Sequence, residues 1–275
     1  MLGVLIFSGT LPATRVAVAT FDPIFFTLAR ASIAGVLAVM ILLLMRQSLP
    51  ARSDYRALLV VALGVVVGFP LLAALALRHV SAAHATVFVG LLPIMTVIFS
   101  VLRGGENPRW MFWLFSISGS LVVAGFAAGQ GIQVSLLDDL LMLLAVTLCG
   151  LGYAEGARLA HRLGGWQVIC WALVIALPLM LPLSLWTLPG NLQQVSWPAW
   201  LSLAYVTLFS MLIGFFFWYH GLARGGIASV SRLQLLQPFF SLGLAALILG
   251  EHVSAAIVAS ALAVALCVVG AKRYA

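Results

Sequence analysis

Ten long apolar runs divide the chain, and they constrain its fold more than any other feature of the sequence. A helix needs about 20 mainly apolar residues to cross a bilayer. Lipid offers the backbone no hydrogen-bond partners, so a spanning segment must be helical or part of a closed barrel. The sequence therefore predicts an all-α integral membrane protein with ten transmembrane helices, at residues 1–18, 24–45, 55–77, 83–102, 109–128, 137–160, 166–187, 198–222, 227–248 and 253–271.

The composition excludes several classes of soluble protein. Charged residues make up 8% of the chain and hydrophobic residues 64%, whereas a soluble domain carries roughly 25% charged residues. The net charge of +7 comes from scattered arginines, which argues against a nucleic-acid partner. The three cysteines lie in separate apolar stretches, so we expect free thiols, no metal site and no cofactor. No charged segment precedes the first apolar run, which argues against a cleavable signal peptide.

The cations of the loops predict the orientation of the chain. If ten spans alternate across the membrane, Arg78 is alone among the loop cations on one side. Cytoplasmic loops are enriched in Lys and Arg, so both termini are expected in the cytoplasm, and the protein in a bacterial-type cytoplasmic (inner) membrane. The loop cations of the predicted cytoplasmic side are Arg46, Arg52, Arg56, Arg103, Arg109, Arg162, Arg224, Lys272 and Arg273.

An internal repeat relates the two halves of the chain. A shift of 145 residues (238 minus 93) aligns Pro93 with Pro238 and Glu106 with Glu251, and in both copies a Gly precedes the Glu. Each half holds five predicted spans, and because five is odd, the second half must be inverted. Inverted repeats that meet at a midplane site are typical of secondary transporters. We predict two inverted five-helix repeats, at residues 1–130 and 135–273.

Several features together resemble the drug/metabolite transporter superfamily, and more narrowly its EamA-type permeases. They are the two five-span repeats, the Pro…Gly-Glu frame, and an arginine early in the second span, in Phe26-Thr27-Leu28-Ala29-Arg30-Ala31. The resemblance covers essentially the whole chain and implies a ten-helix exporter of small metabolites or amino acids that works by alternating access. It also implies further helical turns before Phe7-Ser8-Gly9-Thr10, which stands in place of the family's small/aromatic motif.

Charges within the predicted spans are candidates for a functional site, because an Arg or Asp at the centre of a membrane helix costs roughly 2.5–3.5 kcal/mol to insert. Arg15, with Pro12 and Thr14 beside it, is the preferred candidate for a cation that meets a substrate carboxylate, since Pro12 weakens the first span locally. The alternative is that Arg15 and Arg30 reach towards the interface and pair with Asp22 or with a carbonyl group.

The sixth span is the repeat partner of the first and carries Glu155 and Arg158 on one helix face. One interpretation is a local ion pair near the cytoplasmic end. The other is a carboxylate at which proton and substrate compete, as in the small multidrug-resistance relatives of the superfamily, with Tyr153 lining the same space. His84, early in the fourth span, is either an interfacial histidine or a proton relay.

Aromatic and polar residues of the last spans complete the candidate site. Phe215 and Phe216 lie deep enough to form an aromatic cavity wall, although a belt at the interface is the usual interpretation of such a cluster. Arg232, Gln234 and Gln237 lie around Pro238, and they either face the cavity or hold helices together.

Pro93 and Pro238 with Glu106 and Glu251 are interpreted as a structural repeat motif. We expect each glutamate at the start of the helix that follows it in the chain, where the helix dipole favours a carboxylate.

The sequence favours a non-enzymatic secondary transporter that exports small metabolites such as amino acids across the cytoplasmic membrane. The alternatives are drug or cation efflux by proton antiport, a channel, and an intramembrane enzyme. A channel needs a filter loop, and an enzyme needs reactive groups at membrane depth, whereas Asp138-Asp139 are expected at a helix start beside a loop. The expected partners are a small-molecule substrate and the lipid bilayer, and we expect a monomer.

Overall fold

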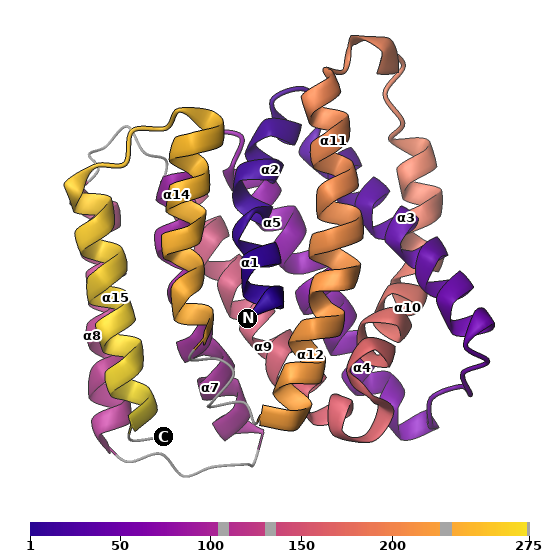
Figure 1. The fold of residues 1–275 in the computed structure, drawn as a ribbon, viewed down its shortest axis with the longest axis horizontal. Helices are drawn as coiled ribbons and strands as arrows, with labels where there is room; N and C mark the ends of the chain where they lie inside the picture. Colours follow the sequence, from indigo (N-terminus) through magenta and orange to yellow (C-terminus); the bar gives the residue numbers. More distant parts are fainter. Residues whose placement is uncertain (104–109, 130–135, 226–232, 274–275) are drawn as a thin grey trace.

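The computed structural model is described for residues 1–103, 110–129, 136–225 and 233–273. Throughout these ranges the chain forms helices joined by turns and short loops, with no strand (Figure 1). The first half contains α1 Leu2–Ser8, α2 Thr10–Val18, α3 Pro23–Leu44, η1 Arg52–Asp54, α4 Tyr55–Val61, η2 Ala62–Gly68, α5 Phe69–Ala76, α6 Ala82–Val89, α7 Leu92–Leu102 and α8 Trp110–Gly129. The second half contains α9 Leu136–Leu163, α10 Gly165–Trp186, η3 Leu192–Gln194, α11 Trp197–Tyr205, η4 Val206–Ile213, α12 Gly214–Gly225, η5 Gln234–Leu236, α14 Gln237–Leu249 and α15 Ala255–Arg273.

Many of these helices are long and apolar enough to cross a membrane. The prediction of an all-α, multi-pass membrane protein is therefore confirmed, whereas the count of ten spans, the inverted repeat and the sidedness of the termini stay predictions. Within the described ranges, six segments satisfy length and apolarity together: Pro23–Leu44, Arg52–Ala76, Ala82–Leu102, Leu136–Leu163, Gly165–Trp186 and Trp197–Arg224. Shorter apolar helices occupy Leu2–Val18, Gln237–Leu249 and Ala255–Cys267.

Asp22 explains why α3 begins where it does. Its side chain accepts hydrogen bonds from two backbone N–H groups of the first turn, at 2.9 Å and 3.2 Å. Pro23 opens the helix, at a position where no N–H donor is needed. The expected pairing of Asp22 with Arg15 or Arg30 does not occur, because this carboxylate caps its own helix.

Interruptions of the helices recur in the two halves at nearly the offset of the sequence repeat. The π-helical segments η2 and η4 begin at Ala62 and Val206, 144 residues apart (206 minus 62). Pro93 and Pro238 lie in the first turns of α7 and α14, each directly after a break in a helical segment. Segments of π-helix are rare and are frequent at functional sites. These paired irregularities support the interpretation of the chain as a duplication.

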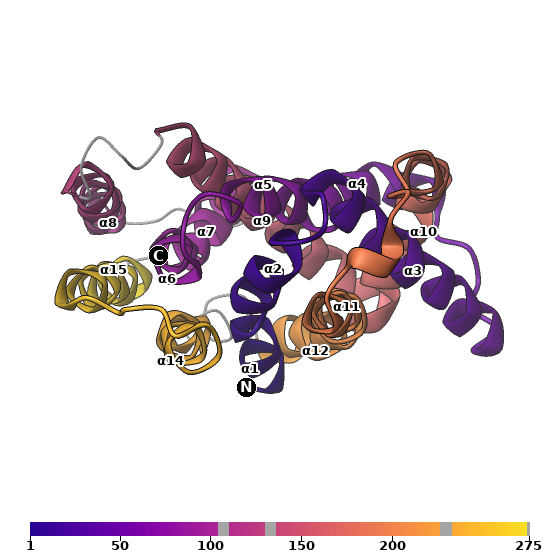
Figure 2. The same ribbon diagram turned by 90° about the horizontal axis from the view of Figure 1, so that it is seen from above.

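Helices from the two halves pack against one another across the bundle. α3 packs along α10, α8 packs along α15, and α9 packs against α5 and α7. Seen from above, the pairs α8–α15 and α3–α10 lie at opposite ends of an elongated bundle (Figure 2). The N-terminal helices, α9, α12 and α14 lie between them, so side chains of both halves meet in the middle.

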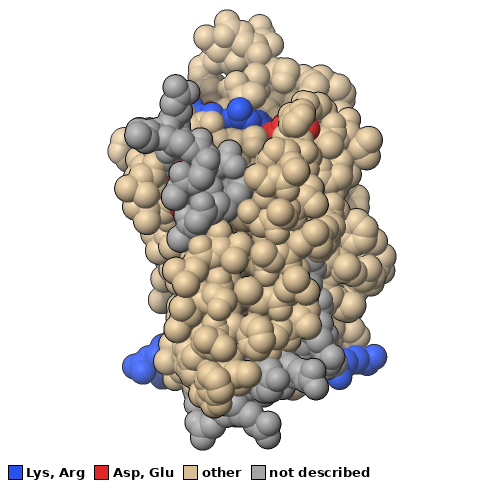
Figure 3. Space-filling view, turned by 90° about the vertical axis from the view of Figure 1, so that its left-hand side faces the viewer, with Lys and Arg blue, Asp and Glu red and all other residues tan. Residues whose placement is uncertain are grey.

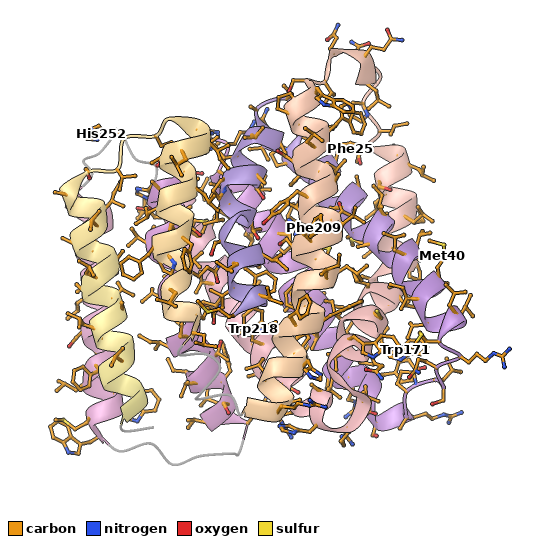
Figure 4. The ribbon with its side chains drawn as sticks, viewed as in Figure 1. Phe25, Met40, Trp171, Phe209, Trp218 and His252 are labelled. Atoms are coloured by element: carbon orange, nitrogen blue, oxygen red, sulfur yellow. The ribbon has the colours of Figure 1, made fainter. Side chains whose placement is uncertain are left out.

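Charged side chains gather near the two ends of the bundle, and the surface between them is largely uncharged on the face drawn in Figure 3. We call the end with the α5–α6 turn, residues 77–84, the Arg78 side, and the end where α7 stops the Arg103 side. Met40 and Phe209 lie on the outside between these ends (Figure 4), and they are 46% and 44% exposed. A belt of exposed apolar side chains is expected where a protein contacts lipid tails.

Candidate functional site

The described residues line three cavities that follow one another through the bundle. A cavity of about 670 Å³ lies on the Arg78 side, beside Arg15 and Glu251. A cavity of about 420 Å³ lies on the Arg103 side, beside Arg103 and Glu155. Between them lies a small central chamber of about 30 Å³. The bundle is therefore hollowed from both ends and narrowest in the middle.

The central chamber is lined by polar side chains and aromatic rings from both halves of the chain. Thr10 of α2 and Arg30 of α3 come from the first half. Tyr153 of α9, Phe215 of α12 and Gln237 of α14 come from the second half. Each of these side chains is at most 7% exposed, so they surround a space shielded from solvent and lipid.

Arg30 places a positive charge in this chamber. Its side chain is 3% exposed, its Nε has no hydrogen-bond partner, and it forms no ion pair within the described part of the chain. The side-chain oxygen of Gln237 also lacks a partner. A buried cation without a counter-charge is costly, and such residues in membrane helices mark functional sites. The chamber is therefore suited to the anionic group of a bound molecule.

Aromatic rings form an apolar part of the wall of the same chamber. The Phe7 and Phe215 ring centroids are 4.8 Å apart. The Tyr153 ring lies 5.9 Å from that of Phe215 and 5.5 Å from that of Trp218, and Figure 4 labels Trp218 on α12. Stacked and edge-on rings give a rigid apolar wall, and their faces also attract cations. A molecule with one carboxylate and an apolar or ammonium part would find complementary surfaces here.

Arg15 lies outside the central chamber. Its Nη1 donates hydrogen bonds to the backbone carbonyls of Leu77 and Arg78, the latter at 2.9 Å. These carbonyls follow the last turn of α5, so Arg15 ties α2 to the end of α5 beside the Arg78-side cavity. Arg15 was expected either to face the substrate cavity or to pair with Asp22 or a carbonyl group, and in the structure it pairs with carbonyl groups. Pro12 and Thr14 are buried in α2 and are not chamber-lining residues.

Glu155 lies at the Arg103-side cavity and forms ion pairs with two arginines. One of its carboxylate oxygens is 3.1 Å from Arg103 Nε and 3.7 Å from Arg158 Nη1. The pair with Arg158 agrees with the interpretation of Glu155 as part of a local ion pair. The contact with Arg103, at the end of α7, was not expected from the sequence. On the same side, Asp54 and Arg162 form a second ion pair that joins η1 to α9. These contacts tie α9 to the first half of the chain.

Glu251 caps a helix of the other half, not the helix that follows it. Its two carboxylate oxygens accept hydrogen bonds from the backbone N–H groups of Ala82 and Ala83, each at 2.9 Å. These donors open α6 and have no partner within the helix. The expectation that Glu251 serves its own following helix is therefore wrong, because α15 begins only at Ala255, while the N-terminus of α6 lies within reach.

His84 is paired with an aspartate of α9. Its Nε2 lies 2.7 Å from Asp139 Oδ1, and the side chains are 8% and 10% exposed. His79 Nδ1 lies 3.1 Å from Asp138 Oδ1, with that aspartate side chain 3% exposed. The two aspartates begin a helix, as expected, and they are buried, with their carboxylates against His79 and His84.

The remaining candidates fall elsewhere. Phe216 lies against Trp166, with ring centroids 6.3 Å apart, and does not line the chamber. Gln234 is 1% exposed, and neither polar atom of its amide has a partner. Arg232 and Glu106 lie outside the described residues.

Two chamber features were not expected at this place. Arg15 was preferred over Arg30 as the cation that faces the cavity, and only the rotation of α3 in the bundle turns Arg30 inward. The hydroxyl groups of Thr10 and Ser210 lie 2.8 Å apart at the chamber wall. Hydroxyl side chains are common in membrane helices, so nothing in the sequence distinguished this pair.

Comparison with known proteins decides the family. The sequence profile described as "EamA-like transporter family" matches residues 1–127 and again residues 136–271. The chain belongs to the EamA-like transporter family. This family is part of the drug/metabolite transporter superfamily, so the protein is a membrane transporter and not an enzyme. The resemblance seen in the sequence is confirmed.

Relatives of this EamA-like transporter are named as transporters too. The "Uncharacterized transporter YdeK" of Bacillus subtilis is 63% identical over 274 residues, which cover 100% of this chain and 96% of the relative. The "Probable terminal-alkyne amino-acid exporter" of Streptantibioticus cattleyicolor is 28% identical over 176 residues, which cover 63% of this chain and 58% of the relative. A solved crystal structure with 18% identity aligns over 98% of this chain and 94% of its own, with a TM-score of 0.68. That similarity shows a shared fold.

Proposed function

We propose that this EamA-like transporter is a secondary transporter that exports small carboxylate-bearing metabolites, amino acids among them, across the cytoplasmic membrane. One chamber between the two inverted halves is reached alternately from either side. The observation that carries the proposal is Arg30, a buried cation without a counter-ion among the described residues. The name of the relative from Streptantibioticus cattleyicolor, an amino-acid exporter, supports the same substrate class.

Arg30 favours carboxylates over cations. A guanidinium offers two parallel N–H donors that match the two oxygens of a carboxylate. An organic cation in the same chamber would bring two like charges together away from water, which is strongly unfavourable. The rings of Tyr153 and Phe215 supply a surface for the rest of the substrate. The alternative of drug or cation efflux is therefore less compatible with this chamber.

The three cavities support alternating access. The central chamber of about 30 Å³ is far smaller than the roughly 300–1,000 Å³ of pockets that hold small molecules, so an amino acid needs a wider chamber than this conformation offers. Ion pairs of Glu155 and Asp54 close the Arg103 side, and the contacts of the α5–α6 turn close the Arg78 side. Opening one set of contacts at a time would connect the chamber to one cavity at a time.

The distribution of cations supports the orientation of the chain in the membrane, and export as the direction follows the family resemblance and the name of the relative from Streptantibioticus cattleyicolor. Nearly all loop Lys and Arg residues belong to the Arg103 side in the ten-span arrangement, and cytoplasmic loops carry such an excess. Substrate would enter from the Arg103 side and leave on the Arg78 side.

Counterflow in proteoliposomes tests the proposal. Vesicles loaded with an unlabelled amino acid are mixed with labelled amino acids, with the amines that remain after their decarboxylation, and with a quaternary ammonium ion. We expect exchange of amino acids and little exchange of the amines or the cation. Arg30→Gln should lower exchange about 10- to 100-fold, because hydrogen bonds to charged groups contribute roughly 1.5–3 kcal/mol.

A matched control is Arg224→Gln. Arg224 is exposed in the last turn of α12, so its replacement removes the same charge without touching the chamber, and exchange should stay at the wild-type rate. Equal exchange of amino acids and their decarboxylated amines would contradict the proposed substrate class, and so would full activity of Arg30→Gln.

A further inference from the structure

The α5–α6 turn is held by side chains from three other parts of the chain. Arg15 of α2 binds carbonyl groups at the start of the turn. Glu251, which follows α14, binds the N–H groups of Ala82 and Ala83 at its end. Both Arg15 and Glu251 also line the Arg78-side cavity. We call these contacts, together with the two histidine–aspartate pairs below, the Arg78-side latch, because they join both halves at the rim of this cavity.

Two histidines are the members of the latch that can change charge near neutral pH. His84 in α6 lies 2.7 Å from Asp139 of α9, and both side chains are largely buried. His79 in the turn lies 3.1 Å from Asp138 and is 66% exposed. The two aspartates are adjacent in α9, and one pair has an exposed histidine while the other is largely buried.

Both acidic and basic side chains lie around His84. The neighbouring α14 and α7 carry no ionisable side chain, and those of α15 are Cys267, Lys272 and Arg273, near its far end. The ionisable groups that face the latch come from α9, from α2, from the segment after α14 and from the turn itself. Within the described part of the chain they include Asp138, Asp139, Arg15, Glu251, Arg78 and His79.

We propose that His84 and Asp139 form a proton-binding site that holds the Arg78 side closed. When His84 takes up a proton, its hydrogen bond to the Asp139 carboxylate becomes an ion pair, because the imidazolium adds a positive charge beside the negative one at a largely buried place. When the proton leaves, the attachment of α6 to α9 weakens and the Arg78 side opens more readily. The inference rests on the proposed alternating access, and it names the ion that controls one of its steps.

The structure favours His84 over Glu155 for this role. Glu155 is held between Arg103 and Arg158 on the opposite side of the bundle, where it serves as an inter-helix ion pair. The contact between His84 and Asp139, by contrast, joins α6 to α9 on the Arg78 side, and its strength depends on the proton. The proton site therefore belongs to the closing contacts of the Arg78 side and lies apart from the chamber with Arg30.

Accessibility of a native thiol tests the proton site without any transport assay. Cys149 lines the central chamber, and with Cys170→Ala and Cys267→Ala it is the one remaining thiol. A small, membrane-impermeant thiosulfonate is added from the Arg78 side between about pH 5 and pH 8, where histidine titrates. We expect the labelling rate to rise with pH about 5-fold or more beyond the rise of a free thiol, which corresponds to a typical coupling of about 1 kcal/mol.

His84→Gln should abolish this additional pH dependence, whereas His161→Gln, an exposed histidine near the other end of α9, should retain it. If His84→Gln does not fold, Asp139→Asn keeps the shape of the aspartate and should likewise flatten the profile. A wild-type pH profile in the His84 or Asp139 variant would overturn the inference. Since no substrate is added, this outcome is independent of whether the counterflow assay identifies carboxylates.

Discussion

At the scale of single residues, two buried charges have opposite surroundings. Glu155 is 4% exposed and has two arginines within 3.7 Å, whereas Arg30 is 3% exposed and has no counter-ion among the described residues. Breaking a buried ion pair destabilises a protein, and replacing an unpaired buried charge by an apolar side chain relieves a desolvation penalty. One charge therefore stabilises the fold, and the other is kept for its function.

Stability measurements should separate these two roles. Arg30→Met is expected to raise the unfolding free energy by about 1–3 kcal/mol, the penalty of an unsatisfied buried polar group. Glu155→Gln is expected to lower the melting temperature, because two arginines lose their carboxylate. Thermal unfolding of the purified protein in detergent measures both. A lower melting temperature for Arg30→Met, with Arg224→Gln unchanged, would show that Arg30 has a stabilising partner.

The sequence identified which residues carry unusual charge, but not where each side chain points. The cost of an intramembrane charge singled out Arg15, Arg30 and Glu155; Arg15 and Glu155 form contacts between helices, and Arg30 lines the chamber. Which arginine faces the chamber depends on the rotation of α2 and α3 in the bundle. The pair of His84 and Asp139 joins residues 55 positions apart, so no local pattern could predict it.

At the scale of helices, the close packing of η2 against α9 depends on glycines. A Cβ atom on Gly64 in η2 would lie 2.4 Å from the carbonyl oxygen of Leu148 and 3.3 Å from the backbone of Gly152. Two glycines therefore let η2 and α9 approach backbone to backbone, as small residues do in membrane bundles. This approach holds α9, with Cys149 and Tyr153, against the chamber.

Gly64→Ala should separate these elements. The added methyl group meets a backbone atom that cannot move aside, so we expect a loss of roughly 1–3 kcal/mol in stability, seen as a lower melting temperature in detergent. Gly243→Ala is the matched control, since a Cβ atom there meets nothing within 4 Å. Equal melting temperatures for the two variants would contradict the close approach of η2 to α9.

Element boundaries were partly predictable. The apolar runs predicted continuous spans at residues 83–102 and 227–248, whereas α7 and α14 begin inside them, next to Pro93 and Pro238. Proline fits the first turn and not the interior of a helix, which explains these starts. The π-helical segments were not predictable, since an apolar run gives no sign of one extra residue per turn. The cap that Glu251 provides to α6 was also missed, because the helix it serves belongs to the other half of the chain.

At the scale of the whole molecule, the account depends on two halves that cross the membrane in opposite directions. The family profile matches the chain twice, and the helix breaks recur near the sequence offset. Length, apolarity and charge predicted an all-helical membrane protein because the bilayer imposes these features directly. How the halves interlock depends on side-chain packing, which periodicity alone does not encode.

Sided labelling should reveal the inversion. In a variant without its native cysteines, Arg103→Cys and His252→Cys place one thiol after each of the related helices α7 and α14. We expect an impermeant maleimide added to intact cells to label His252→Cys and not Arg103→Cys, because inverted repeats put these ends on opposite sides of the membrane. Labelling of both positions from outside is incompatible with inverted halves, and labelling of Arg103→Cys alone would contradict the predicted orientation.

The central claim is that both sides of the membrane reach one chamber, where Arg30 receives the substrate carboxylate. The most direct measurement follows Cys149, as the single thiol, in sealed vesicles of each orientation, with the impermeant thiosulfonate added outside. The account predicts labelling from both sides, and protection by a saturating transported amino acid but not by its decarboxylated amine. Labelling from only one side, or none of this protection, would contradict it.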